Sequence, residues 1–142
     1  MIRLIFLMAI AVIGLAANGA ELIVADGQVR VPMPGRTVTA GYFTIQNNTA
    51  ETVSLTAVKS SAFERAELHQ HSHQDGVMRM EQIPHIAIEA NTSVTLQPGG
   101  LHLMLFDPLQ PLLVGESVNL SLTFSNGQQL ELSMPLTEMP RR

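Results

Sequence analysis

The sequence predicts an all-β domain, an antiparallel sandwich or barrel of about eight or nine short strands. Three observations predict this class. From Glu21 onward no long segment has the 3.6-residue hydrophobic period of a helix. Short β-rich runs recur instead, each closed by turn residues. Asn126-Gly127, between two alternating runs, indicates a hairpin, because a type I′ turn needs a positive φ at both positions.

The expected strands follow one another at short, regular intervals, which leaves no room for crossover helices. They are residues 38–46, 52–59, 66–71, 77–82, 93–97, 101–106, 117–124 and 129–134. Asp75-Gly76 and Pro98-Gly99-Gly100 mark turns between them. Residues 26–37 are expected to form an irregular edge or loop, and residues 83–92 a loop that frames the site described below.

Residues 1–20 have the pattern of a secretory signal peptide rather than of a folded element. A short start containing Arg3 is followed by an apolar run over residues 4–13 and then by small residues. The run is too short to span a membrane, which takes roughly 20 apolar residues. We expect cleavage between residues 16 and 20, leaving one soluble domain over residues 21–142. No cysteine follows the run, which excludes a lipid-anchored lipoprotein.

The composition excludes several classes of protein. The 142-residue chain has no cysteine, so it holds no disulfide, thiolate nucleophile, iron–sulfur cluster, cysteine-based zinc site or blue-copper centre. Its eight basic residues form no run and the net charge is −4, so no nucleic-acid partner is expected. No catalytic Ser/His/Asp order, phosphate-binding glycine loop or carboxylate pair stands out, and we expect no enzyme.

The histidines and several methionines gather in one stretch, where strand alternation sorts them by face. All five histidines lie between residues 69 and 102. On the run 101–106, His102 and Met104 project opposite a face of leucines that can enter the core. The same alternation places further donor side chains together on two other runs: Glu67, His69 and His71 on one, Met78 and Met80 on the other.

A site that combines imidazole and thioether ligands suits few metal ions. Thioethers are soft and neutral, so they favour Cu(I) over Zn(II), Mg(II) or Ca(II). Taken singly, a methionine on a strand is more often core filler and a surface histidine more often solvated. A purely structural role of this kind fits His71, His73 and His85. It fits His102 and Met104 less well, because both lie opposite a face of three leucines.

The spacing of four of these residues resembles a known family. Gaps of ten, twenty-one and one residues separate His69, Met80, His102 and Met104 in turn. This spacing reproduces the H-x10-M-x21-H-x-M signature of the periplasmic Cu(A) chaperone (PCuAC) family. Neighbouring segments are similar too, among them Glu67-Leu68-His69 and Asp75-Gly76-Val77-Met78. The resemblance covers roughly residues 22–136.

The resemblance implies a cupredoxin-like, Greek-key β-sandwich whose exposed site binds Cu(I) through His69, Met80, His102 and Met104. It implies a periplasmic protein that carries copper toward the dinuclear Cu(A) centre of cytochrome c oxidase, with subunit II as the accepting partner. We expect a monomer. The tail after residue 136 has no histidine, unlike members of the family with a His- and Met-rich extension. We therefore expect no second site there.

Two alternative functions stay open, and a secondary copper site is a further candidate. A copper-buffering or resistance protein would use the same site without a delivery partner. A metal-free adhesion or assembly module would use the sandwich alone. The run His69-x-His71-x-His73 is richer in imidazole than one Cu(I) site requires, so His71 or His73 is a candidate for capturing Cu(II) at a secondary site or a transient second ion.

Overall fold

The computed structural model describes residues 21–138, which form ten strands and no helix. The strands are β1 (Leu22–Arg30), β2 (Val38–Asn47), β3 (Val53–Ser60), β4 (Phe63–Gln74), β5 (Val77–Gln82), β6 (Ile86–Ile88), β7 (Thr92–Thr95), β8 (His102–Pro108), β9 (Ser117–Phe124) and β10 (Gln129–Thr137). The predicted all-β class is confirmed. The expected signal peptide lies outside the described residues. Within 21–138 no segment is a helix long and apolar enough to cross a membrane.

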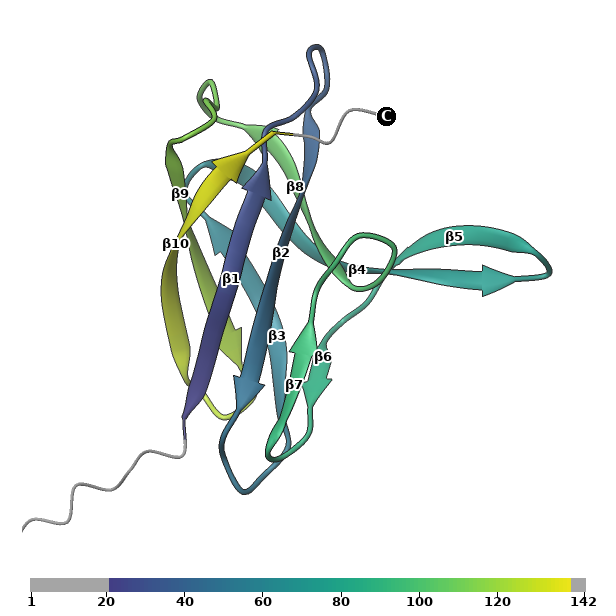
Figure 1. Cartoon of the computed structure of the whole chain (residues 1–142), viewed down its shortest axis with the longest axis vertical. Helices are drawn as coiled ribbons and strands as arrows, with labels where there is room; N and C mark the ends of the chain where they lie inside the picture. The colour runs from purple at the N-terminus through teal and green to yellow at the C-terminus, as the bar shows by residue number, and fades with distance from the viewer. Residues whose placement is uncertain (1–20, 139–142) are drawn as a thin grey trace, which may run out of the picture.

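The strands form two layers that pack face to face, with β1 and β2 in front of β3 and β9 in Figure 1. One layer runs β5-β4-β8-β2-β1, with β7 also paired to β2, and the other runs β10-β9-β3-β6. Every pairing is antiparallel except that of β1 with β10, where Val29 lies opposite Leu136. The first and last described strands therefore join the two layers.

Two segments expected to be irregular contain strands. Residues 26–30 are strand rather than irregular edge, because β1 continues past a bulge at Asp26-Gly27 and pairs again with β2. Asp26 takes a positive φ of 56° there, and a Cβ at residue 27 would lie 3.1 Å from the Met134 side chain, so glycine fits the close approach. Residues 83–92 contain β6, which pairs with β3 in the far layer instead of framing the site.

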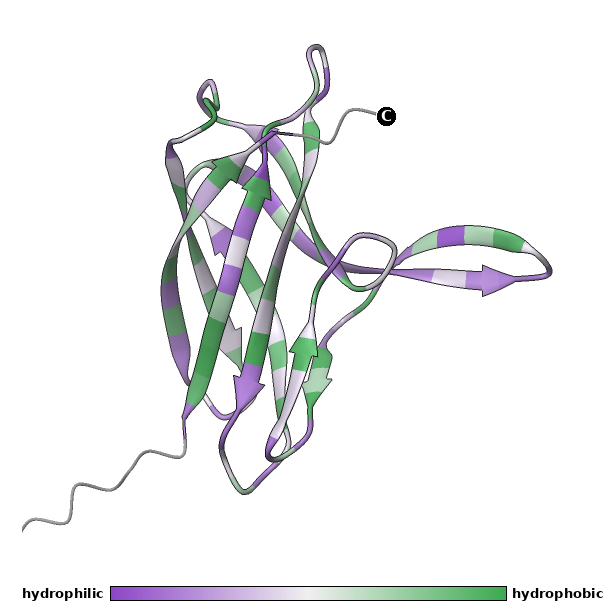
Figure 2. Ribbon diagram, in the orientation of Figure 1, coloured by the Kyte–Doolittle hydropathy of each residue, from purple (hydrophilic) through white to green (hydrophobic). Residues whose placement is uncertain are grey.

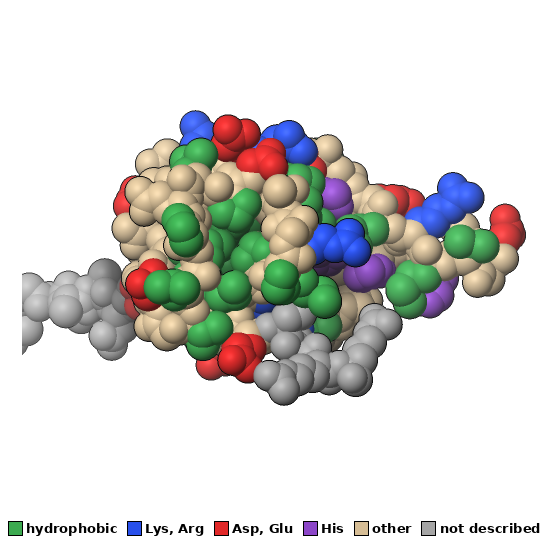
Figure 3. Space-filling view, turned by 90° about the horizontal axis from the view of Figure 1, so that it is seen from above, with side chains coloured by type: hydrophobic (Ala, Val, Ile, Leu, Met, Phe, Trp, Pro, Cys, Tyr) green, Lys and Arg blue, Asp and Glu red, His purple; other side chains and the backbone are tan. Residues whose placement is uncertain are grey.

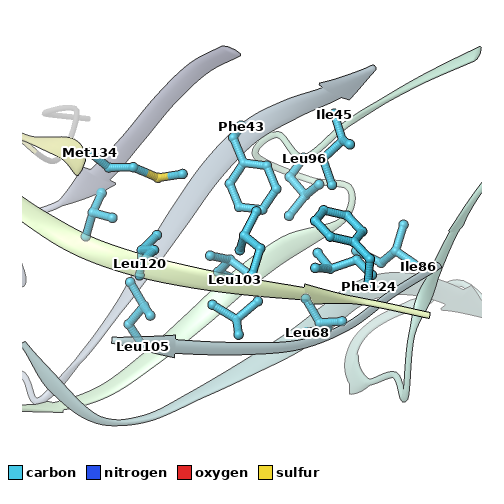
Figure 4. Packing of buried hydrophobic residues seen from close by; sticks show 14 of the residues in the cluster. Phe43, Ile45, Leu68, Ile86, Leu96, Leu103, Leu105, Leu120, Phe124 and Met134 are labelled. Carbon is cyan, nitrogen blue, oxygen red and sulfur yellow. The ribbon is translucent and has the colours of Figure 1, made fainter. Parts of the chain in front are cut away.

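The core lies between the layers and is built from one side of each strand. Hydrophobic and polar residues alternate along the strands in Figure 2. Leu103 and Leu105 of β8 are fully buried and meet Leu120 and Phe124 of β9 (Figure 4). Because β8 sends these leucines inward, the alternate side chains of the same strand lie on its outer face.

The β4–β5 hairpin projects beyond the sandwich (Figure 1). The first part of β4 pairs with β8 as far as His69, and the part from there to Gln74 pairs with β5 alone. Asp75 and Gly76 both have positive φ, 52° and 74°, which closes a two-residue turn of the kind that hairpins favour. The hairpin is thus an arm that contributes little to the core.

A buried asparagine fixes the end of β2. Asn47 is fully buried, and its Nδ2 donates to the carbonyls of Glu51 and Ile88 at 2.9 and 2.8 Å. Its Oδ1 accepts from the backbone and hydroxyl of Thr49. One side chain therefore holds the turn after β2 and ties it to β6.

We expect Asn47→Ala to lower the free energy of unfolding by about 2 kcal/mol, because it removes the hydrogen bonds of a fully buried side chain, among them the buried bond to the Ile88 carbonyl. Urea denaturation followed by circular dichroism measures the change. Asn119→Ala is the matched control, since residue 119 is exposed on β9 and should shift stability by no more than about 0.5 kcal/mol. Equal midpoints for the two variants would contradict this role.

Candidate metal centre

Imidazole and thioether side chains gather on the outer face of β8, β4 and β5. Across the β4–β8 ladder His69 lies opposite His102, and Glu67 lies opposite Met104. Across the β4–β5 ladder His71 lies opposite Met80, and His73 lies opposite Met78. Since cross-strand partners share a face, these residues all lie on the side away from the buried Leu68 and Leu103. The topology thus brings the four candidate residues to one face.

The imidazole rings stand close together. The ring centroids of His69 and His102 are 5.9 Å apart, and those of His71 and His102 are 5.0 Å apart. The ring of Phe106 lies 6.4 Å from that of His69 on its other side. His102 is therefore flanked by two imidazoles, although His71 was not among the four residues of the signature.

Hydrogen bonds fix which nitrogen of each key ring is free. His102 Nδ1 lies 3.0 Å from the Gly100 carbonyl, which can only accept, so Nδ1 carries the proton. His69 Nε2 lies 2.8 Å from the Glu67 carboxylate and donates to it in the same way. The remaining nitrogens, His102 Nε2 and His69 Nδ1, are buried without a hydrogen-bond partner. This is the arrangement of metal-binding histidines, whose second nitrogen is held by a carbonyl or carboxylate.

Exposure increases across the face from β8 to β5. His102 is 3% exposed, whereas Met80 is 49% exposed on the projecting hairpin. Met104 and His69 are half-buried between these extremes. In Figure 3 histidine side chains lie where the hairpin meets the sandwich and further out along the hairpin, with hydrophobic side chains beside them. The face therefore combines a buried, oriented end with an open, thioether-bearing end.

The surroundings of two groups on this face favour the neutral form of His102 and the ionised form of Glu67. Burial lowers the pKa of His102 below its usual 6.5, against a smaller opposing effect of the Gly100 carbonyl. The hydrogen bond from His69 lowers the pKa of Glu67, and the positive charge of Arg65 adds to this effect. Arg65 Nε lies 2.9 Å from Glu67 Oε1 and its guanidinium stacks on Phe106 at 4.1 Å.

A metal site on this face would need the methionine sulfur atoms as well as the imidazole nitrogens. Among residues 21–138 no group of three or more His, Cys, Asp or Glu side chains is arranged to hold a metal ion. Met104 and Met80 add two thioethers to the two free imidazole nitrogens on the same face. Such a neutral N,S set suits a soft monovalent ion.

Sequence reasoning placed some residues correctly and missed others. The shared faces of His102 with Met104, and of His69 with Glu67, are as predicted. Met80 lies directly opposite His71 and diagonal to His69. The spacing of these residues in the sequence does not predict this pairing of β4 with β5. The orienting carbonyl of Gly100 was also missed, because a backbone acceptor leaves no side-chain signal. His85 is exposed and lies outside the strands.

A β-sandwich with imidazole and thioether donors on one outer sheet face defines a candidate soft-metal-binding domain. Residues 22–136 match the profile of the family described as "Putative lipoprotein LpqE-like". The chain belongs to this LpqE-like family.

Named relatives and solved structures agree with this assignment. The chain is 28% identical over 126 residues to "Putative lipoprotein Lxx21020" of Leifsonia xyli subsp. xyli, covering 88% of this chain and 74% of that protein. It resembles the solution structure of the Cu(I) form of DR1885 from Deinococcus radiodurans, with TM-score 0.68, 28% identity, and coverage of 81% and 76%. The copper-bound PCuAC domain from PmoF2 has TM-score 0.71 at 21% identity, over 85% of this chain and 95% of that domain. The predicted cupredoxin-like sandwich is thereby confirmed as a PCuAC-type fold.

The low pKa of His102 predicts how stability changes with pH. In the unfolded chain this imidazole binds a proton near pH 6.5, whereas in the folded protein it resists protonation. The metal-free protein should therefore lose stability as the pH falls from about 7.5 to about 5.5. Urea midpoints across that range measure the effect.

His102→Gln, which keeps an amide near the Gly100 carbonyl but does not titrate there, should flatten this pH dependence. His85→Gln is the matched control, because residue 85 is exposed and should leave the slope as in the wild type. The titration range stays above the pKa of Glu67, so its carboxylate remains charged throughout. A wild-type slope in His102→Gln would contradict the assignment.

Proposed function

We propose that this protein is a periplasmic copper chaperone that binds Cu(I) through His69, Met80, His102 and Met104 and delivers it to a partner protein. The single observation that carries the proposal is the pair of free, buried imidazole nitrogens on His102 and His69, placed on one sheet face with two thioethers. The copper ion is the cargo, and no catalytic step is part of the proposal.

The donor chemistry favours Cu(I) over the metals that a protein meets more often. A site of two imidazoles and two thioethers is neutral, so it balances a monovalent ion better than a divalent one. It has no thiolate and cannot be lost to disulfide formation in an oxidising compartment. The solved Cu(I) form of DR1885 supports the same ion, since that protein shares the fold and 28% of its sequence with this chain.

The exposure gradient suits release as well as capture. His102 and His69 are oriented by Gly100 and Glu67, so they lose little freedom on binding. Met80 stands half exposed on an arm and provides a weak, flexible ligand. A partner can displace this thioether first and then share the ion, so the copper passes without being released into solvent.

The delivery target that we propose is the Cu(A) centre of cytochrome c oxidase, reached through subunit II outside the inner membrane. Residues 1–20 have the pattern of a secretory signal peptide, and the family description names a lipoprotein, which is a class of exported protein. We therefore propose export by the signal peptide at residues 1–20 and action in the periplasm. A copper-buffering protein with the same site but no partner is the alternative.

Removing either thioether should weaken copper binding without unfolding the domain. We expect Met80→Leu and Met104→Leu each to lower Cu(I) affinity about tenfold or more, since leucine keeps the apolar volume and removes the sulfur. Anaerobic competition against a chromogenic Cu(I) chelator measures the affinity.

Met33→Leu is the control for these variants, because Met33 is an exposed methionine, at 57% against 49% for Met80, and lies outside the candidate face. It should bind Cu(I) as tightly as the wild type. Wild-type affinity in both Met80→Leu and Met104→Leu would reject the four-ligand site.

Delivery is tested by mixing the Cu(I)-loaded protein with the metal-free soluble domain of oxidase subunit II. We expect copper to move to subunit II, as measured by the copper content of each protein after separation. A subunit II variant lacking its copper ligands should receive none. Retention of copper by the donor in both mixtures would favour the buffering alternative.

A further inference from the structure

The projecting part of the β4–β5 hairpin carries apolar side chains that folding does not explain. Beyond the sandwich, Val77 and Met78 are 52% and 57% exposed, and Met80 is 49% exposed. Side chains of this kind normally enter a core, and here the arm contributes none. Val77 lies opposite Gln74, on the other face of the hairpin from the two methionines, and has no ligand atom. The exposed thioethers of Met78 and Met80, on an arm beside the candidate metal centre, point to a chemical role.

The hairpin separates two kinds of side chain on its two faces. One face carries polar and charged groups, among them Ser72, whose hydroxyl donates to the Glu81 carboxylate at 2.9 Å. The other face carries imidazoles from β4 and thioethers from β5, in the cross-strand pairs His71 with Met80 and His73 with Met78. Direct cross-strand partners have Cβ atoms about 4.5–5.5 Å apart, so each pair can offer one nitrogen and one sulfur to a single ion.

These pairs form a row that ends at the candidate centre. Successive pairs on one face are two residues apart, which is about 7 Å along the strand. His71 stands next in line to the centre, because its ring centroid is 5.0 Å from that of His102. Its Nδ1 is buried without a hydrogen-bond partner, as are the free nitrogens of His69 and His102.

The geometry points to a second, weaker Cu(I) site at the tip of the hairpin, formed by His73 and Met78, from which His71 and Met80 lead the ion to the main site. The inference rests on the proposed function and extends it to uptake. Both tip residues are exposed, so a copper donor can reach them, and two neutral ligands hold the ion less tightly than four. Copper remains Cu(I) throughout, and each move exchanges one ligand for the next without electron or proton transfer.

The test is an anaerobic Cu(I) titration of the metal-free protein labelled with ¹³C at the methionine methyl groups. We expect the first equivalent to shift the methyl signals of Met80 and Met104. The second equivalent should shift that of Met78, and Met33 should not move. Single Met→Leu variants assign the signals.

The double variant His73→Gln/Met78→Leu should lose the second equivalent and keep the first, and should load more slowly from a weak Cu(I)–chelator complex. The matched control is His85→Gln/Met33→Leu, which removes one exposed imidazole and one exposed thioether away from the hairpin. It should bind two equivalents and load at the wild-type rate.

Two results would overturn the inference: a Met78 signal that stays unshifted through two equivalents, or a double variant that retains the second equivalent. Failure of the proposed function looks different, because Met80 and Met104 would then not respond to the first equivalent. A shift of Met78 that is lost in the double variant would still support the tip site in that case.

Discussion

The register of β4 on β8 is the constraint on which the rest of the structure depends. Leu68 lies opposite Leu103 on the core side, and that pairing places His69 opposite His102 on the outer side. Side chains alternate with a period of two, so a slip of one residue would bury the imidazoles and expose the leucines. The burial of apolar side chains in the core therefore also fixes the positions of the imidazole and thioether donors on the outer face.

Within that frame the two imidazoles and two thioethers differ in how firmly they are held. His102 is buried and bound to a backbone carbonyl, and His69 is bound to a carboxylate that Arg65 holds in turn. The thioether of Met80 stands on an arm that touches the sandwich only at its base. In the function that we propose, the oriented imidazoles bind the ion with little loss of freedom, and the more mobile thioether lets a partner compete for it.

Alternation and turn residues were enough to predict the class of fold and the face on which His102 and Met104 lie. They could not predict β1 past residue 26, because the bulge at Asp26-Gly27 interrupts the alternation and the strand is held by backbone bonds to β2 and β10. Nor could they predict that His71 approaches His102, since strand register comes from tertiary packing. Nor could they predict that Gly100 orients the His102 ring, because it does so through its backbone carbonyl, a group that every residue has.

The parallel pairing of β1 with β10 also bears on how the chain folds. Val29 finds its partner in Leu136, more than a hundred positions later, so the two layers cannot be closed until the last strand is available. Contacts this distant in sequence cost loop-closure entropy and slow folding. The hairpin of β4 and β5, by contrast, needs only a two-residue turn. Local pairing of the arm can therefore precede completion of the sandwich, and a chain truncated before β10 would lack the strand that joins its layers.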